Sequence, residues 1–359
     1  MSRELPIPTV LGLRAGDEVD VRSEEEILST LDAEGKLEGL PFMPEMLQHC
    51  GTRTRVHRRA NKACDTVTRN MSRRMLNTVH LANLRCDGAH HAGCQAACLM
   101  FWKEAWLKRP ATAQAPAPAQ AAGDTLAASE TSHGSRGSGA PGASASPAGQ
   151  SRRPVALTRR RLHELASYEG PAPERETHYR CQATELPHVG RALRWWEPGQ
   201  YVRELVTGNV GLVPFLRAMG ISWFNAIQRW RGGLPYPHVE GLLTDHTPRQ
   251  TIGLQAGERV RVRPLKEILA TLDVHQRNRG LWFDVEMVPF CGQEYVVQRR
   301  VNTIIHEPTG KVMTWPGDCI VLEGVVCSGC LSRNRLFCMR AITAYWREIW
   351  LERVEASTR

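Results

Sequence analysis

Short segments that alternate apolar and polar residues occur near both ends of the chain. Residues 18–22 (EVDVR) and 259–263 (RVRVR) place valine at every second position, directly after a glycine-containing turn. A period of two is typical of a strand with one buried face. Apolar residues around Val56 and Val297, and across 79–81 and 320–322, indicate further strands. The pattern therefore predicts an α+β fold with many short strands.

Helical spacing appears between and after these strands. Residues 24–32 (EEEILSTLD) and 265–273 (LKEILATLD) each predict a short helix in a loop. Tryptophans stand four residues apart at 102 and 106 and again at 346 and 350. That spacing predicts a closing helix whose tryptophans anchor the core.

The recurring pattern is an internal duplication. Residues 13–61 align without a gap onto 254–302, and 23 of the 49 pairs are identical. The later segments VHLANLRCDG and FWKEAWLKR match IVLEGVVCSG and YWREIWLER. We call these stretches the first copy and the second copy.

Composition between the copies changes twice. From 110 to 154, 32 of 45 residues are Ala, Pro, Gly or Ser, which predicts a disordered linker. We expect a first module at 1–109, the linker at 110–157, a helical connecting segment at 158–245 and a second module at 246–359. Within the connecting segment, residues 210–230 are apolar but interrupted by Pro214, Arg217 and Gly220, so no membrane span is expected. A helix packed between the copies is favoured, and a helix lying at a membrane interface is the alternative.

Two resemblances follow from these motifs. Each copy opens on G-D/E-x-V-x-V and continues as short strands, which resembles SH3-like barrels of the KOW type. With the phrases YRCQATEL, GLWFDVEM and YWREIWLERV, the chain resembles an uncharacterised bacterial family with such a duplicated barrel and Cys/His-rich segments. This implies two SH3-like modules, each closed by its tryptophan-bearing helix. Genes of this family that lie near polysaccharide or specialised-metabolite genes would imply an accessory role in biosynthesis. The family supplies no catalytic residues.

Composition narrows the class of protein. The 359 residues are 42% hydrophobic and 23% charged, which excludes collagen-like, wholly disordered and multispanning membrane proteins. A net charge of +9 permits nucleic-acid partners without requiring them. The first residues show no signal-peptide pattern, so we expect a cytoplasmic protein whose eleven cysteines are reduced, metal-bound or buried.

Clustered cysteines and histidines in the first copy predict a metal site. Three cysteines and two histidines fall within thirteen residues, and a Cys3His set fits tetrahedral zinc. The candidate ligands of this first set are Cys64, Cys86, His90, His91, Cys94 and Cys98.

A related cluster stands in the second copy. Cys327 and Cys338 align with Cys86 and Cys94, which favours a second metal site. The candidate ligands of this second set are His306, Cys319, Cys327, Cys330 and Cys338. Zinc, up to two ions per chain, is the expected cofactor, and an iron–sulfur cluster is the alternative. Because these spacings are not those of standard zinc fingers, buried thiols of the core remain the other explanation.

Matched residues outside the clusters have competing roles. Glu45 and Glu286 stand in apolar stretches, where a carboxylate acts as a base, caps backbone N–H groups or pairs with Arg22 or Arg263. Cys50 and Cys291 are expected to be buried turn residues. Arginine pairs at 58–59 and 299–300 suit nucleic acid or simply a solvated strand.

These observations favour a zinc-binding, non-catalytic tandem module that recruits a protein or peptide. A metal- or thiol-dependent enzyme or biosynthetic accessory factor, and a nucleic-acid-binding protein, are the alternatives. No P-loop, GxSxG or HExxH motif is present, so the sequence leaves open whether a reaction is catalysed.

Overall fold

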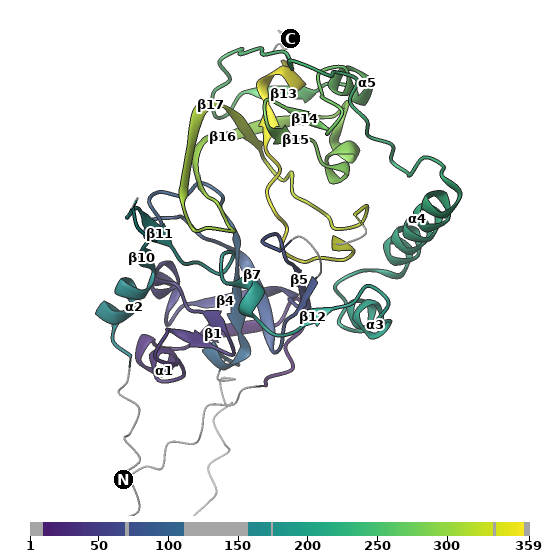
Figure 1. Ribbon diagram of the computed structural model, residues 1–359. Helices are drawn as coiled ribbons and strands as arrows, with labels where there is room; N and C mark the ends of the chain where they lie inside the picture. The colour runs from purple at the N-terminus through teal and green to yellow at the C-terminus, as the bar shows by residue number, and fades with distance from the viewer. Residues whose placement is uncertain (1–9, 69–71, 111–156, 174, 333–334, 355–359) are drawn as a thin grey trace, which may run out of the picture. The chain divides into compact units, whose positions relative to one another are not determined.

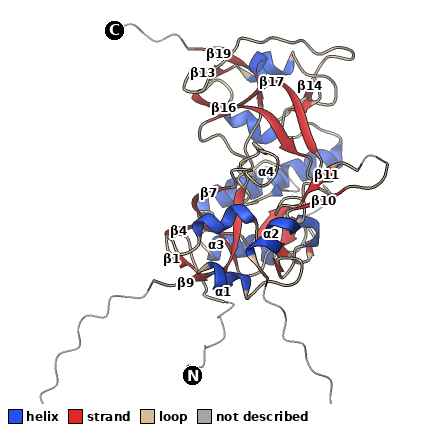
Figure 2. Cartoon of the chain, turned by 90° about the vertical axis from the view of Figure 1, so that its left-hand side faces the viewer, coloured by secondary structure: helices blue, strands red, loops and turns tan. Residues whose placement is uncertain are grey.

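The computed structural model describes residues 10–68, 72–110, 157–173, 175–332 and 335–354. Within these ranges the fold is α+β, with many short strands and few helices (Figures 1 and 2). The described residues belong to one compact unit that contains both copies. Almost all of the predicted linker, 111–156, lies outside them.

A five-stranded antiparallel sheet forms the centre of the first copy. Its strand order is β8-β7-β4-β1-β9. The strands are β1 (Glu18–Val21), β4 (Arg53–Arg59), β7 (Thr78–Arg85), β8 (Leu99–Lys103) and β9 (Leu107–Lys108). The predicted strands at 18–22, around Val56 and at 79–81 are therefore confirmed.

The second copy repeats this arrangement. Its five-stranded sheet has the equivalent order β18-β17-β16-β13-β19. The strands are β13 (Arg259–Val262), β16 (Glu294–Ile305), β17 (Val312–Leu322), β18 (Trp346–Arg347) and β19 (Leu351–Arg353). In the part of the chain that is described neither sheet closes into a barrel, so the expected barrels are open sheets.

Shorter elements complete each copy. The predicted loop helices are present as α1 (Glu24–Leu28) and α5 (Leu265–Leu269). The small two- and three-stranded sheets are built from β2 (Lys36–Leu37), β3 (Leu40–Pro41), β5 (Lys62–Cys64), β6 (Ser72–Arg74), β10 (Ser167–Glu169), β11 (Thr177–Tyr179), β12 (Ala192–Leu193), β14 (Arg277–Asn278) and β15 (Leu281–Trp282). The 3-10 turns are η1 (Pro44–His49), η2 (Glu104–Trp106), η3 (Leu186–His188), η4 (Val285–Phe290) and η6 (Glu348–Trp350).

The tryptophans occupy the core, but on a different backbone from the one predicted. Instead of a helix, Trp102 lies on β8 and Trp106 ends η2, a single 3-10 turn that leads into β9. Phe42 meets the two indoles edge-on, with ring centroids 6.2 and 5.1 Å away. Phe283 meets Trp346 and Trp350 in the same way in the second copy. The predicted anchoring role holds, while the predicted closing helix is wrong.

The glutamate between each pair of tryptophans is a buried anchor. Glu104 has no exposed surface and accepts hydrogen bonds from the backbone N–H groups of residues 11–13 and from Arg59, 2.5 Å away. Glu348 accepts hydrogen bonds from the backbone N–H groups of residues 252 and 253 and forms an ion pair with Arg300. Each carboxylate thereby attaches the segment that precedes the first strand of its copy, residues 11–13 or 252–253, to the sheet.

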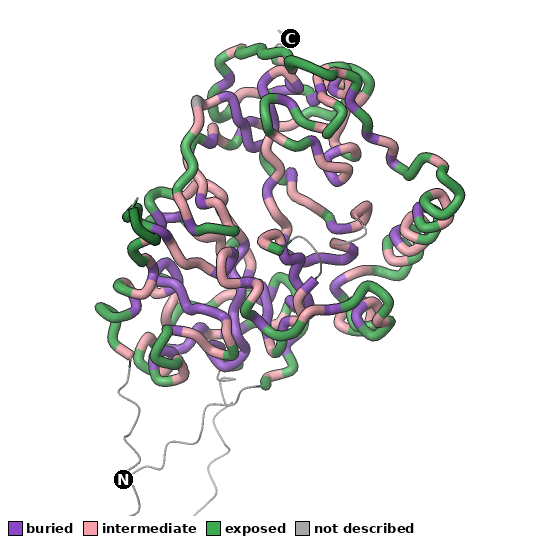
Figure 3. Tube along the Cα trace, in the orientation of Figure 1, coloured by how far each residue is buried: buried purple, intermediate pink, exposed green. Residues whose placement is uncertain are grey.

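The connecting segment contains three helices, α2 (Arg159–Leu165), α3 (Gly199–Val206) and α4 (Leu212–Arg231). Helix α3 begins directly after Pro198, which is its N-cap residue. The helix expected between the copies, α4, packs on one side only, where Phe215 stacks on Phe337 at 5.1 Å. Much of its other side is exposed (Figure 3), which corrects the expectation of a helix enclosed by both copies.

The two copies exchange contacts reciprocally. The Sγ atom of Cys94 accepts a hydrogen bond from the backbone N–H of Ile305, and the Sγ atom of Cys338 accepts one from the N–H of Cys64. These contacts are equivalent, because 94 aligns with 338 and 64 with 305. Each copy's cysteine loop therefore packs against the end of a strand of the other copy.

The two copies differ at His80. It lies fully buried on β7, with Nδ1 2.9 Å from the carbonyl of Met100. Burial lowers the pKa of His80 to about 3. Its equivalent in the second copy is Val321, which is also fully buried. His80 is therefore neutral in the folded chain and takes up a proton on unfolding in mild acid.

We expect His80→Val to weaken the acid sensitivity of folding. Above about pH 6.5 the histidine is neutral in both states, and below it only the unfolded state gains the proton, so stability falls toward pH 3. This residue contributes a slope of about 1.4 kcal/mol per pH unit in that window. Urea unfolding at several pH values measures the slope. An unchanged slope in the variant would contradict the buried neutral imidazole.

Candidate metal centre

Three side chains of the first copy meet in a buried group. Glu45 comes from η1, Cys86 follows β7 directly, and His91 lies in the loop after it. One ligand atom from each lies within 4.8 Å of the others. Over the described ranges this is the one such group of three or more His, Cys, Asp or Glu residues.

The loop that carries Cys86 and His91 is shaped by Gly88. Its φ of +72° lies in the left-handed region, and a Cβ there would come within 2.1 Å of the carbonyl oxygen of Cys94. Glycine is therefore required for this turn. Backbone bonds from His91 to Gly88 and from Cys94 to His91 then close the loop.

Hydrogen bonds hold His91 in one orientation. Nδ1 contacts Oε1 of Glu45, and Nε2 lies 3.0 Å from the carbonyl oxygen of Arg180. A carbonyl that accepts from one ring nitrogen is the usual device for orienting a metal-binding histidine. Nδ1, which faces Glu45, is then the nitrogen that would bind a metal ion, after losing the proton that it shares with this carboxylate.

Glu45 is an ionised carboxylate with an unused oxygen. Burial opposes its ionisation, but the hydrogen bond and the electrostatic attraction of the His91 ring, together with the His90 N–H, outweigh burial and lower its pKa. Oε1 accepts both bonds, whereas the buried Oε2 has no hydrogen-bond partner among the described residues. An unpaired buried carboxylate oxygen is costly, and a cation would relieve that cost.

The donor set therefore fits a metal ion. Thiolate, imidazole and carboxylate are all zinc ligands, and catalytic zinc sites combine three protein ligands with one open position. Burial raises the pKa of Cys86 far above its ordinary value. Coordination would deprotonate this thiol outright.

A cavity of about 290 Å³ adjoins the centre. Cys86 and His91 line it, together with Cys94, Cys98 and Cys181. Residues of the second copy, among them His306 and Arg340, contribute to its wall. Burial raises the pKa of Cys98 to about 12 and that of Cys181 to about 11, so these thiols are protonated at neutral pH when no metal is bound.

In the equivalent glutamate of the second copy, both carboxylate oxygens have hydrogen-bond partners. Glu286 accepts hydrogen bonds from the Ser328 hydroxyl at 2.7 Å and from the N–H groups of residues 330, 331 and 332. Ser332 stands where the first copy has His91. Both carboxylates hold the loop after the third strand of their sheet, but only Glu45 retains an unpaired oxygen beside a histidine. Neither pairs with Arg22 or Arg263, which contact Glu26 and Glu267.

The predicted ligand sets are divided differently by the structure. Of the first set, Cys86 and His91 join the buried group, Cys94 and Cys98 line the cavity, and the ring of His90 stacks edge-on against His163, 4.5 Å away. Cys64 belongs with the second copy: it adjoins Cys338, and Cys327 lies near both.

The remaining members of the second set are dispersed. His306 lines the first copy's cavity, and Cys319 is buried on β17 against Arg347. Cys330 sits beside Glu286 in the 328–332 loop. Burial opposes ionisation of Cys338, but the Cys64 thiol and Arg340 outweigh it and lower the Cys338 pKa to about 6.

Two functional candidates were outside the sequence-based ligand sets. Cys181 enters the cavity from the connecting segment, and Gln182 beside it exchanges two 2.8 Å hydrogen bonds with the backbone of Phe101. In the sequence, the segment YRCQATEL was the only feature that drew attention to Cys181 and Gln182. Glu45 was recognised as a matched carboxylate, but nothing in the sequence placed it near Cys86.

The arginines proposed for nucleic acid make contacts within the chain. Arg59 and Arg300 pair with the buried glutamates described above. Arg58 contacts Met339, and Arg299 donates to the carbonyl of Gln95. Burial raises the pKa of Cys50 and Cys291 to about 11, which argues against reactive thiols at those turns.

None of the described helices is long and apolar enough to cross a membrane. Comparison of the chain with protein-family models, with curated proteins and with solved structures found no match.

Proposed function

We propose that the chain is a zinc protein whose single metal centre is held by Glu45, Cys86 and His91. The observation that carries this proposal is that the buried Glu45 carboxylate lies beside a thiol and an imidazole and keeps one oxygen, Oε2, without a hydrogen-bond partner. The second copy, where Glu286 has all its partners, supplies the internal contrast.

The proposal extends to a metal-dependent reaction on a small molecule. Three protein ligands leave a coordination position for water or substrate, and a bound zinc ion supplies Lewis-acid chemistry there. Two of the ligands line the cavity of about 290 Å³, a volume at the lower end of those of small-molecule sites. A metal-dependent enzyme is thus favoured over a closed structural site.

A thiol nucleophile is less well supported. Nucleophilic cysteines need a depressed pKa and access to solvent. Burial raises the pKa of Cys86, Cys98 and Cys181 instead. These three cysteines therefore serve the metal or the cavity wall.

The SH3-like interpretation stays a proposal about the scaffold. It is supported by two antiparallel sheets of equivalent strand order, each with a 3-10 turn between its last two strands. Recruitment of a protein or peptide likewise stays a prediction. The second zinc ion expected from the sequence is not part of this proposal, because the described residues of the second copy bring no three ligands together.

Metal analysis of a matched pair of variants tests the function. We expect about one zinc ion per purified chain and a loss of affinity of at least about tenfold in Glu45→Gln. Glu286→Gln, which changes the equivalent carboxylate, should keep its metal, because its oxygens bind backbone N–H groups. Elemental analysis and competition with a chelator measure both.

Three results would contradict the proposal. Glu45→Gln could bind zinc as tightly as the unchanged chain, or Glu286→Gln could lose the ion. A brown chain with visible absorption would instead indicate an iron–sulfur cluster on the cavity cysteines.

A further inference from the structure

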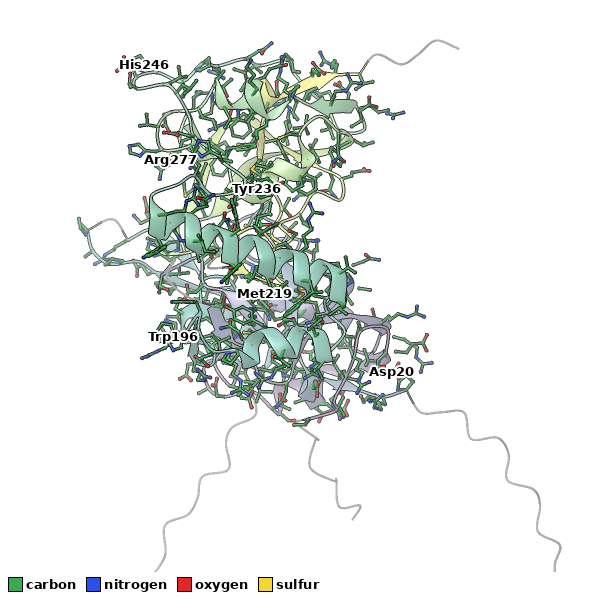
Figure 4. All side chains as sticks on the ribbon, turned by 90° about the vertical axis from the view of Figure 1, so that its right-hand side faces the viewer. Asp20, Trp196, Met219, Tyr236, His246 and Arg277 are labelled. Atoms are coloured by element: carbon green, nitrogen blue, oxygen red, sulfur yellow. The ribbon has the colours of Figure 1, made fainter. Side chains whose placement is uncertain are left out.

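Helix α4 presents an apolar face to solvent. Residues 212, 213, 216, 220, 223, 224, 227 and 230 fall on one side of the helix, and the first polar side chain on that side is Arg231 at the end of α4. Val213, Trp223 and Trp230 are 78%, 72% and 88% exposed. Figure 4 shows α4 on the near side of the molecule, with α3 beside it.

The opposite side of α4 accounts for its attachment. Phe215 stacks on Phe337, Ala218 is buried in the same cluster, and Asn225 exchanges two 2.6 Å hydrogen bonds with the backbone of Tyr236. The helix is thus fixed by one face, and the exposed apolar face takes no part in fixing it.

The charged residues of α4 all have one sign. Residues 212–231 contain three arginines and no acidic residue. On a helical projection Arg217 borders the apolar face, and Arg231, the last residue of α4, lies at its C-terminal end. Exposed Arg203 lies on α3, whose one acidic residue, Glu204, is fully buried.

From this arrangement we propose that α4 binds the surface of an anionic lipid bilayer, lying in the plane of the membrane with Trp223 and Trp230 among the headgroups. Amphipathic helices with tryptophan and leucine on one face and arginines at its borders bind in this way. Anionic lipid adds an attraction that increases with each arginine near the surface.

Self-association fits the same face less well. In a two-fold dimer a surface meets its own copy, so the three arginines of each α4 would find no acidic residue on the other α4. Like charges brought together in this way oppose association. An anionic bilayer satisfies the apolar and the basic residues at once.

Vesicle sedimentation of the full chain tests this proposal. We expect binding to phosphatidylcholine vesicles that contain about one-third phosphatidylglycerol, and binding at least about fivefold weaker without that lipid. Trp223→Ser combined with Trp230→Ser should weaken binding at least about tenfold. Trp282→Ser, at a half-exposed tryptophan of the second copy, is the matched control and should bind normally.

A second pair, Val213→Ser with Leu216→Ser, repeats the test at the other end of α4. Both pairs change exposed residues, so their melting temperatures should match that of the unchanged chain. The proposal is overturned if the chain ignores anionic vesicles at low ionic strength or if both pairs bind like the control. It is equally overturned if light scattering shows a dimer in solution that both pairs dissociate, which would assign the face to self-association.

Discussion

Cys86→Ser is expected to abolish zinc binding and, with it, the stabilisation that zinc gives the folded chain. An ion that binds only the folded state stabilises it by about 4 kcal/mol when free metal exceeds the dissociation constant about a thousandfold. The unchanged chain should therefore melt at a lower temperature after chelation. The variant should melt at one temperature with or without the chelator.

The equivalent cysteine provides the control. Cys327 lies beside Glu286 as Cys86 lies beside Glu45, and burial raises the pKa of both thiols. Cys327→Ser should keep its zinc and its response to the chelator. Cobalt substitution adds a direct readout, since the absorption of a thiolate–cobalt bond should be absent from Cys86→Ser alone. Equal zinc in the two serine variants would remove Cys86 from the centre.

The second large effect is expected at the buried glutamates between the tryptophans. Glu104→Ala removes the partner of Arg59 and the acceptor of three backbone N–H groups at once. Breaking a buried ion pair from one side costs about 3–5 kcal/mol, because the remaining partners stay desolvated. Denaturant unfolding should show this as a lower midpoint with an unchanged slope.

An exposed ion pair provides the control for that measurement. Glu164 contacts Arg160 and Arg161 on the surface of α2, and surface pairs contribute less than about 1 kcal/mol. Glu164→Ala should be nearly neutral. If Glu104→Ala costs no more than Glu164→Ala, the carboxylate does not fasten residues 11–13 to the sheet.

Local patterns predicted the strands and the small helices well. The V-x-V segments became β1 and β13, and residues 24–28 form a helix that Ser23 caps with Glu26 at its third position. In each case neighbouring residues alone determine the structure. The tryptophans show the limit, because a spacing of four suits a helix and also a strand followed by one 3-10 turn.

The candidate site was only half predictable for a different reason. Cys86 and His91 lie close together in the sequence, whereas Glu45 reaches them through the fold of the sheet. Cys64 was assigned to the first set by proximity along the chain. The reciprocal packing of the copies moves it to Cys338, 274 residues away. Aligning the two copies shows which residues are equivalent, but it does not show which residues of one copy contact the other.

That reciprocal packing has a consequence for how the chain holds together. The paired contacts, Cys94 with Ile305 and Cys338 with Cys64, are the two halves of a two-fold interface of the kind that joins identical subunits. Here one polypeptide supplies both halves, so association is intramolecular and is governed by an effective concentration instead of the amount of protein. Dilution cannot separate the halves, and a cavity walled by both copies therefore persists in a single molecule.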